Sequence, residues 1–142
     1  MPKVIDTADA FGKVADRRLR SEKIVWLTTT SADGTPQPHA VWFLWDGETV
    51  LMYSIPNQAK LKNISRHPRV SLNLDSAKKG DSIVIVTGTA TIESNALPLN
   101  KNRDYVTKYR AEIERLGLGT AARMAKEYSV AVRITPEKLR GF

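Results

Sequence analysis

The chain has 142 residues, a formal net charge of +7 and no cysteine. This length suits one domain with a real core, so we expect a single domain over residues 1–142. The lack of cysteine excludes disulfides and thiolate chemistry, and with only His39 and His67 no metal site is predicted. No apolar run has the length of a signal peptide or a membrane span, so a cytoplasmic protein is expected.

The positive charge favours an anionic partner, which could be nucleic acid, a membrane surface or a phosphorylated small molecule. The basic residues are spread along the chain, and the densest groups are Arg17-Arg18-Leu19-Arg20 and Lys78-Lys79. Neither group has the interleaved aromatic residues of a single-strand binder. We therefore expect a small-molecule partner, with no nucleic acid and no membrane.

The first third of the chain predicts one helix and then three strands. Residues 7–20 have a helical apolar stripe, with Asp6 or Thr7 as the N-cap. Three segments rich in β-branched and aromatic residues are expected to be strands: 23–30, 38–45 and 49–54. Asp-Gly pairs at 33–34 and 46–47 predict tight turns, and hence an antiparallel meander.

The rest of the chain predicts three more strands and an inserted helical region. A short helix over 59–64 ends at His67-Pro68. Strands are expected at 69–75, at 82–92 with a bulge or bend at Gly88, and at 129–135 with a stop at Pro136.

The helical region between the last two strands begins at Pro98. Val106, Tyr109, Ile113 and Leu116 are expected to share its buried face. Thr120 can cap a further short helix. With six antiparallel strands and edges to protect, the whole pattern favours a mainly β fold closed into a barrel.

The junction between the third strand and the short helix is the strongest candidate site. Pro56 and Asn57 break the strand, and the helix that follows leaves several N–H groups without partners. Such a helix start favours an anion, and Lys60 and Lys62 add positive charge beside it. Two interpretations stay open here: a phosphate-binding loop, or an ordinary connection with solvated lysines.

Several segments in a fixed order carry a family resemblance: Trp26-Leu27-Thr28-Thr29, Asp33-Gly34-Thr35-Pro36, Val41-Trp42-Phe43-Leu44-Trp45-Asp46-Gly47, Tyr53-Ser54 with Gln58 to Ile64, and Pro68-Arg69-Val70. Together they resemble the pyridoxamine 5′-phosphate oxidase-like, FMN-binding split β-barrel superfamily, and most closely its actinobacterial branch that uses coenzyme F420. The resemblance implies a six-stranded antiparallel split β-barrel of Greek-key type, with an N-terminal helix and a helical insertion before the last strand. It also implies a homodimer with cofactor sites at the subunit interface.

The resemblance further implies two sets of cofactor-binding residues. The cofactor phosphate would be held by Ser54, Gln58, Ala59 and Lys60, with Asn63 supporting the loop. The ring system would lie beside Pro38, His39, Ala40, Val41 and Trp42. His39 could equally face solvent, and Arg140 and Phe142 would reach the partner's site.

The function implied by the resemblance is an F420-dependent oxidoreductase that passes a hydride to an unsaturated or quinone-like small molecule. An FMN-dependent oxidoreductase and a non-catalytic F420 or flavin carrier remain alternatives. No catalytic residue is predicted, since no acid–base pair is evident and the cofactor carries the chemistry of hydride transfer. The chain ends at Lys138-Leu139-Arg140-Gly141-Phe142, without the longer segment of true pyridoxamine phosphate oxidases, so the vitamin is not the expected substrate.

Overall fold

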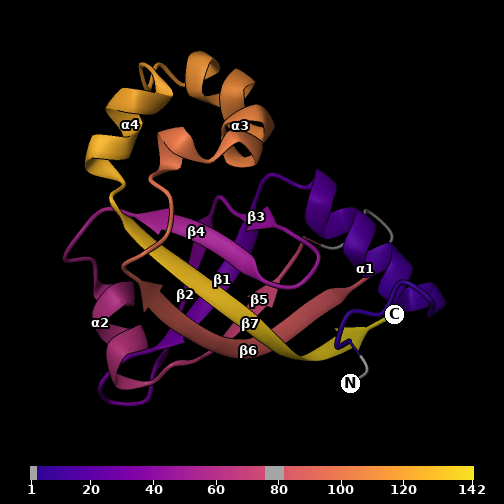
Figure 1. Ribbon diagram of the computed structural model, residues 1–142. Coiled ribbons are helices and arrows are strands. Elements are labelled where there is room, and N and C mark those ends of the chain that lie inside the picture. Colours follow the sequence, from indigo (N-terminus) through magenta and orange to yellow (C-terminus); the bar gives the residue numbers. More distant parts are fainter. Residues whose placement is uncertain (1–2, 76–81) are drawn as a thin grey trace.

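The computed structural model describes residues 3–75 and 82–142, and these form a curled antiparallel sheet with helices around it (Figure 1). In chain order the elements are α1 (Ala10–Ser21), β1 (Val25–Thr30), β2 (Pro36–Val41), β3 (Leu44–Trp45), β4 (Val50–Ser54), α2 (Ala59–Arg66), β5 (Arg69–Asn73), β6 (Val84–Glu93), the 3₁₀ turn η1 (Leu99–Lys101), α3 (Arg103–Arg115), α4 (Ala121–Glu127) and β7 (Val130–Gly141). The sheet order is β2-β1-β5-β6-β7-β4-β3. The mainly β, antiparallel class expected from the sequence is confirmed.

The number of strands is seven in the described residues, not six, because the strand expected over 38–45 is broken. β2 pairs with β1, and β3 pairs with β4, so the two halves lie at opposite ends of the sheet order. The predicted meander is therefore wrong: β1–β2 and β3–β4 are separate hairpins. Only Trp42 and Phe43 join β2 to β3, and this short link requires the sheet to curl until its two ends approach.

The last strand also differs from the prediction, since β7 runs through Pro136 to Gly141. Pro136 lies opposite Gly88, where the register of β6 and β7 shifts. Proline lacks an N–H, and a bulge is one of the few places in a sheet that tolerates this. The bulge predicted at Gly88 is confirmed, and a Cβ there would lie 2.1 Å from the Thr135 carbonyl oxygen.

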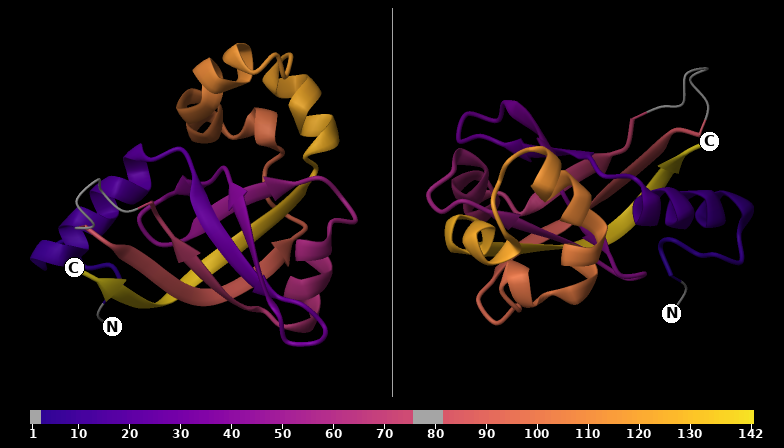
Figure 2. Two further views of the ribbon diagram at one scale, coloured as in Figure 1. Left: turned by 180° about the vertical axis from the view of Figure 1, so that it is seen from behind. Right: turned by 90° about the horizontal axis from the view of Figure 1, so that it is seen from above.

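The barrel interior is mainly apolar and is covered by a helix at each end. Leu19 of α1 and Leu61 and Ile64 of α2 belong to one buried cluster with the inward residues of the strands. α1 lies near the end of β7, far from α2 (Figures 1 and 2). Its N-cap is Asp9, whose carboxylate accepts from the Gly12 N–H at 3.0 Å, and not Asp6 or Thr7 as expected.

The insertion of η1, α3 and α4 stands outside the barrel on its own cluster of buried residues (Figure 2). Tyr105, Tyr109 and Ile113 form the buried face of α3, whereas Leu116, expected on that face, is 51% exposed. Thr120 caps α4 as predicted. No helix in residues 3–75 and 82–142 is long and apolar enough to cross a membrane.

Candidate cofactor site

A cavity of about 450 Å³ lies where the barrel meets the helical insertion. Its wall is made by the end of β2, the β4–α2 junction and the insertion: Ala40, Val41, Trp42, Tyr53, Ile55, Gln58, Lys60, Tyr105, Leu116, Leu118, Met124 and Tyr128. The volume is in the range of small-molecule sites, and the lining is mostly apolar with a few polar groups. Ala40, Val41, Trp42, Gln58 and Lys60 are thus brought together from two segments that the sequence analysis selected separately.

The start of α2 supplies the polar end of this cavity. Asn57 turns the chain with φ of +65°, a conformation that asparagine tolerates better than most residues. Gln58 is the N-cap, and its side chain makes no capping hydrogen bond to the helix. The N–H groups of Leu61 and Lys62 bond back to the Gln58 carbonyl, which leaves the first amides of the helix available to a ligand.

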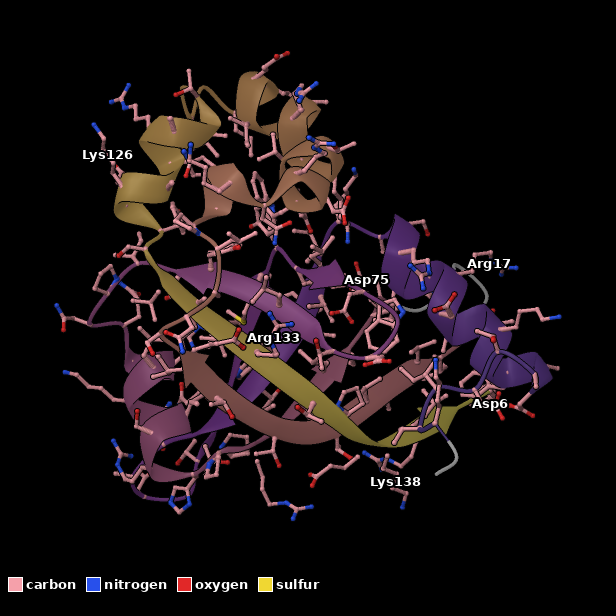
Figure 3. The ribbon with its side chains drawn as sticks, viewed as in Figure 1. Asp6, Arg17, Asp75, Lys126, Arg133 and Lys138 are labelled. Atoms are coloured by element: carbon pink, nitrogen blue, oxygen red, sulfur yellow. The ribbon has the colours of Figure 1, made fainter. Side chains whose placement is uncertain are left out.

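Lys60 is the charged group of the cavity wall. Desolvation by partial burial lowers the pKa of its ammonium group. Within the part of the chain that the structure describes, no carboxylate lies within ion-pair distance of Lys60. Arg133, which lies on β7 (Figure 3), differs from Lys60. Its guanidinium is paired with the carboxylates of Glu93 and Asp46. A half-buried cation without a counter-charge favours an anionic ligand.

The other three phosphate candidates lie near Lys60 in the chain but do not line the cavity. Ser54 is buried, and its hydroxyl donates to the Ile55 carbonyl at 2.9 Å. The Asn63 amide is also buried and donates to the Thr29 hydroxyl at 3.1 Å, which fastens α2 to β1. Ala59 is exposed as the first residue of the helix.

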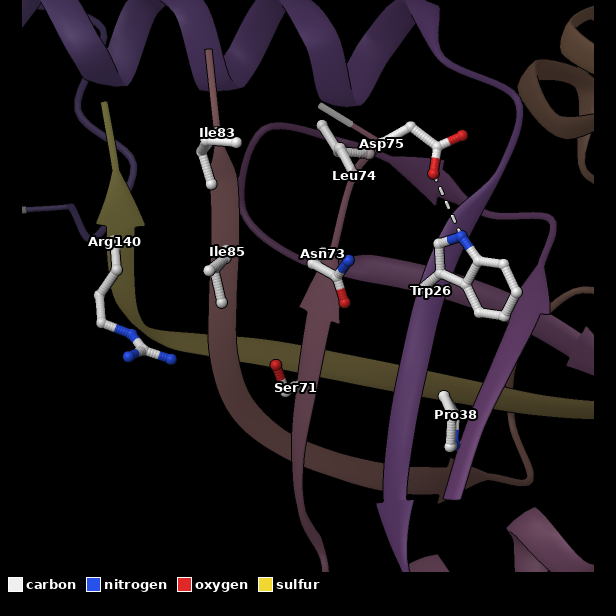
Figure 4. A pocket seen from close by; sticks show the side chains of 9 residues that line it. All are labelled: Trp26, Pro38, Ser71, Asn73, Leu74, Asp75, Ile83, Ile85 and Arg140. Carbon is white, nitrogen blue, oxygen red and sulfur yellow. Dashed lines mark hydrogen bonds between the residues drawn. The ribbon is translucent and has the colours of Figure 1, made fainter. Parts of the chain in front are cut away.

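His39 and Pro38 point to opposite faces of β2. His39 pairs with Leu27, whose side chain is fully buried, and therefore faces the barrel interior. Its Nε2 is buried without a hydrogen-bond partner among the described residues, and desolvation, together with the charge of Lys60, lowers its pKa. Pro38 lies on the outer face, in a separate cavity of about 580 Å³ that Trp26, Ile85 and Arg140 also line (Figure 4).

Aromatic side chains from the barrel and from the insertion also line the cavity. Trp42 stacks on Tyr109 with ring centroids 4.4 Å apart and planes 6° from parallel. Tyr53 and Tyr105 meet edge to face at 5.0 Å. Tyr105 and Tyr109 are both buried on α3, and Tyr105 also lines the cavity.

Sequence reasoning did not select seven of the lining residues: Tyr53, Ile55, Tyr105, Leu116, Leu118, Met124 and Tyr128. The insertion supplies most of them. One local pattern could have indicated Leu116 and Leu118 as lining residues. They alternate with Gly117 and Gly119, which both have positive φ and therefore form a turn. Such a turn exposes apolar side chains next to the cavity, although nothing in the local pattern says what they would face.

The family model described as pyridoxamine 5′-phosphate oxidase matches residues 11–142. This chain belongs to that family. It therefore has the flavin-binding fold that the sequence motifs indicated, and this supports a cofactor of the flavin type. None of the curated proteins matches the chain.

Three solved structures are similar to this chain in fold. A conserved hypothetical protein from Mycobacterium tuberculosis is 26% identical, with a TM-score of 0.68, covering 88% of this chain and 79% of that one. A protein named F420 reductase is 21% identical, with a TM-score of 0.66, covering 93% and 97%. A heme storage protein from Vibrio cholerae is 16% identical, with a TM-score of 0.61, covering 91% and 90%. The last two identities show the shared fold alone.

Proposed function

We propose that this protein is an F420-dependent oxidoreductase that transfers a hydride between the deazaflavin and an unsaturated or quinone-like small molecule. The observation that carries the proposal is the meeting of Lys60 and Gln58 with Ala40, Val41 and Trp42 at one cavity. A cation and a helix start share this cavity with apolar and aromatic side chains. This arrangement suits a cofactor with a phosphate and a flat ring system.

The residues present fit such a cofactor. Lys60 and the free amides at the start of α2 would hold the phosphate, by charge and by hydrogen bonds to the helix start. Trp42 and the backbone of Ala40 would border the ring. When bound, the deazaflavin supplies the hydride exchange. Among the residues that the structure describes, the cavity lining holds no carboxylate and no histidine, so we assign the chain's own contribution to binding, orientation and exclusion of water.

F420 is proposed ahead of FMN because of charge. F420 carries a polyglutamate tail beyond its phosphate, and a protein with a net charge of +7 suits the longer polyanion. Lys62, exposed on α2, is placed to contribute, whereas Lys78 and Lys79 lie outside the described residues. Exposed lysines contribute little each and are screened by salt, so the preference for F420 should shrink as ionic strength rises.

We also propose a homodimer with the cofactor sites at its interface. The outer face of β1, β2, β5 and β6 is hollowed and carries apolar side chains such as Trp26, which is 38% exposed, and Ile85 (Figure 4). Pro38 lines this outer hollow, and Ala40, two residues along the same strand, lines the cofactor cavity. A second copy covering the outer face would therefore border the cofactor site. Sedimentation showing a folded monomer at micromolar concentration would refute the dimer.

The decisive experiment is a set of fluorescence titrations with F420 and FMN at low and high salt. Lys60→Met keeps the apolar stem and removes the charge, so it should weaken binding about ten- to a hundredfold, since a charge-assisted hydrogen bond contributes roughly 1.5–3 kcal/mol. Lys13→Met, at an exposed position of α1, is the matched control and should bind as wild type does.

The outcomes separate the candidate functions. Equal affinity for FMN and F420 at low salt would favour the FMN-dependent enzyme. Binding of F420 without turnover of its reduced form, over a panel of acceptors, would indicate a carrier. If Lys60→Met binds as tightly as wild type, Lys60 does not hold the phosphate.

A further inference from the structure

The break between β2 and β3 is stabilised by side chains of α3. Phe43 lies in the break, is fully buried, and belongs to neither strand. Its N–H and C=O therefore have no place in a strand ladder, and a buried backbone group without a partner is costly. Tyr109 and Lys108 supply those partners. The Phe43 N–H donates to the Tyr109 hydroxyl at 2.8 Å, and the Lys108 ammonium donates to the Phe43 carbonyl at 2.9 Å.

The Tyr109 hydroxyl also takes the place of a backbone hydrogen bond that β1 and β2 would otherwise form directly. Extended by two residues, the β1–β2 register would place Lys23 opposite Phe43. The hydroxyl stands between them, because it accepts from Phe43 and donates to the Lys23 carbonyl at 2.7 Å. The Tyr109 hydroxyl has one proton, and this proton is donated to the Lys23 carbonyl. The Phe43 carbonyl also lies 3.0 Å from this hydroxyl, but it accepts its hydrogen bond from the Lys108 ammonium. The tyrosine thus separates the ends of β1 and β2, and the chain turns away to form β3.

Tyr109 contacts Trp42, which lines the proposed cofactor cavity, and Lys108 contacts its neighbour Phe43. The Tyr109 ring stacks on the Trp42 indole, and the Lys108 ammonium lies 3.8 Å from the centre of the Phe43 ring. Trp42 is therefore held by its neighbour's backbone on one side and by a stacked ring on the other. Both contacts come from α3, which is remote in sequence from β2.

We propose that Tyr109 and Lys108 are positioning residues for cofactor binding, because together they hold the Phe43 backbone and so fix Trp42 in the cavity wall. This inference rests on the cofactor site proposed above. Neither residue is among those that line the cavity, so each acts through Trp42. The helical insertion then has a role beyond covering the cavity: it sets the conformation of the strand beside the ring.

Two variants test this by different routes. Tyr109→Phe keeps a ring to stack on Trp42 and removes the hydroxyl, while Lys108→Met keeps an apolar chain of similar length and removes the ammonium. Lys126→Met is the control, because Lys126 is an exposed lysine of the insertion that projects away from the barrel (Figure 3). Lys108→Arg, which restores a cationic donor, should recover part of the loss caused by Lys108→Met.

Each variant is measured in two ways. Dissociation constants for F420 and FMN should rise at least about tenfold in Tyr109→Phe and Lys108→Met, which corresponds to about 1.4 kcal/mol. In protein labelled with 5-fluorotryptophan, the ¹⁹F resonance of Trp42, assigned with Trp42→Phe, should move in both variants without any cofactor. Lys126→Met should change neither quantity.

The second measurement separates this inference from the proposed function. If wild type binds neither F420 nor FMN, the function is wrong, whatever the Trp42 resonance does. If wild type binds and the variants bind equally well, the positioning role is wrong. Weaker binding with an unmoved Trp42 resonance also refutes it, because the effect would then not pass through Trp42.

Discussion

Replacing Lys108 by methionine should remove a pH dependence of stability that wild type shows above pH 8. Burial, with a smaller contribution from the nearby charge of Lys23, lowers the pKa of Lys108 from 10.5 to about 8 in the folded protein, and Glu22 opposes the shift. Between these two values the unfolded chain binds more protons than the folded one. The free energy of unfolding therefore rises with pH from about 8 to 10.5, and below pH 8 the buried ammonium lowers stability.

The size of this effect follows from the same pKa values. At about 1.4 kcal/mol per pH unit, the full difference would be roughly 3 kcal/mol. The ammonium is only partly buried, and solvent screening reduces such interactions, so we expect about 1–2 kcal/mol. The free energy of unfolding should rise gradually between pH 8 and 10.5, and about half of the total rise should be reached near pH 9.

The assay is urea denaturation of wild type and Lys108→Met at several values between pH 7 and pH 9.5. Taking the difference between the two proteins cancels groups common to both, including Lys60, whose pKa is also lowered. Burial raises the pKa of Tyr109, which lowers stability where unfolded tyrosines ionise, so the range stops below pH 10. A difference in unfolding free energy that stays constant across this range would refute a buried, destabilised charge at Lys108.

Two further outcomes are expected. Gly88→Ala should destabilise the protein by about 1–3 kcal/mol in thermal or urea unfolding, because the new Cβ would lie 2.1 Å from the Thr135 carbonyl oxygen in the bulge. The control Thr91→Ala, at an exposed position of the same strand, should lower the free energy of unfolding by less than about 0.5 kcal/mol. Equal destabilisation by the two substitutions would contradict the close approach at Gly88. Binding of F420 or FMN should raise the pKa of His39, because a phosphate beside Lys60 offsets the positive charge that now helps to lower it. An NMR titration of the histidine ring signals, assigned with His67→Gln, measures this, and an unchanged His39 curve would place the phosphate elsewhere.

Much of the fold was predictable because its signals are local. Asp-Gly pairs mark both hairpin turns, Thr120 marks the start of α4, and Gly88 marks the bulge. Each depends on the conformational preference of one or two residues, and such local preferences do not depend on tertiary contacts. The junction at Pro56 and Asn57 is of the same kind, so the residues alone predict a helix start beside Lys60.

The cavity itself could be predicted only in part. Trp42 and Lys60 were selected from separate segments, and their meeting depends on the curl of the sheet. Met124 on α4 and Tyr128 directly after it could not be assigned to the site, because an apolar or aromatic residue at a short helix indicates burial without indicating its neighbours. Pro38 and Ala40 were grouped together as cofactor residues, yet the structure places them in different cavities.

The antiparallel class, the approximate positions of most elements, the basic charge and the helix start at Lys60 follow from local sequence patterns. The end of β2 after Val41 and the passage of β7 through Pro136 follow from tertiary contacts. Both depend on partners far away in the chain: the hydroxyl of Tyr109 satisfies Phe43, 66 residues distant, and Gly88 makes room opposite Pro136. A local pattern reports which conformations a segment prefers. It does not show which remote side chain will form a hydrogen bond with a backbone N–H or C=O group that has no partner in a strand or helix.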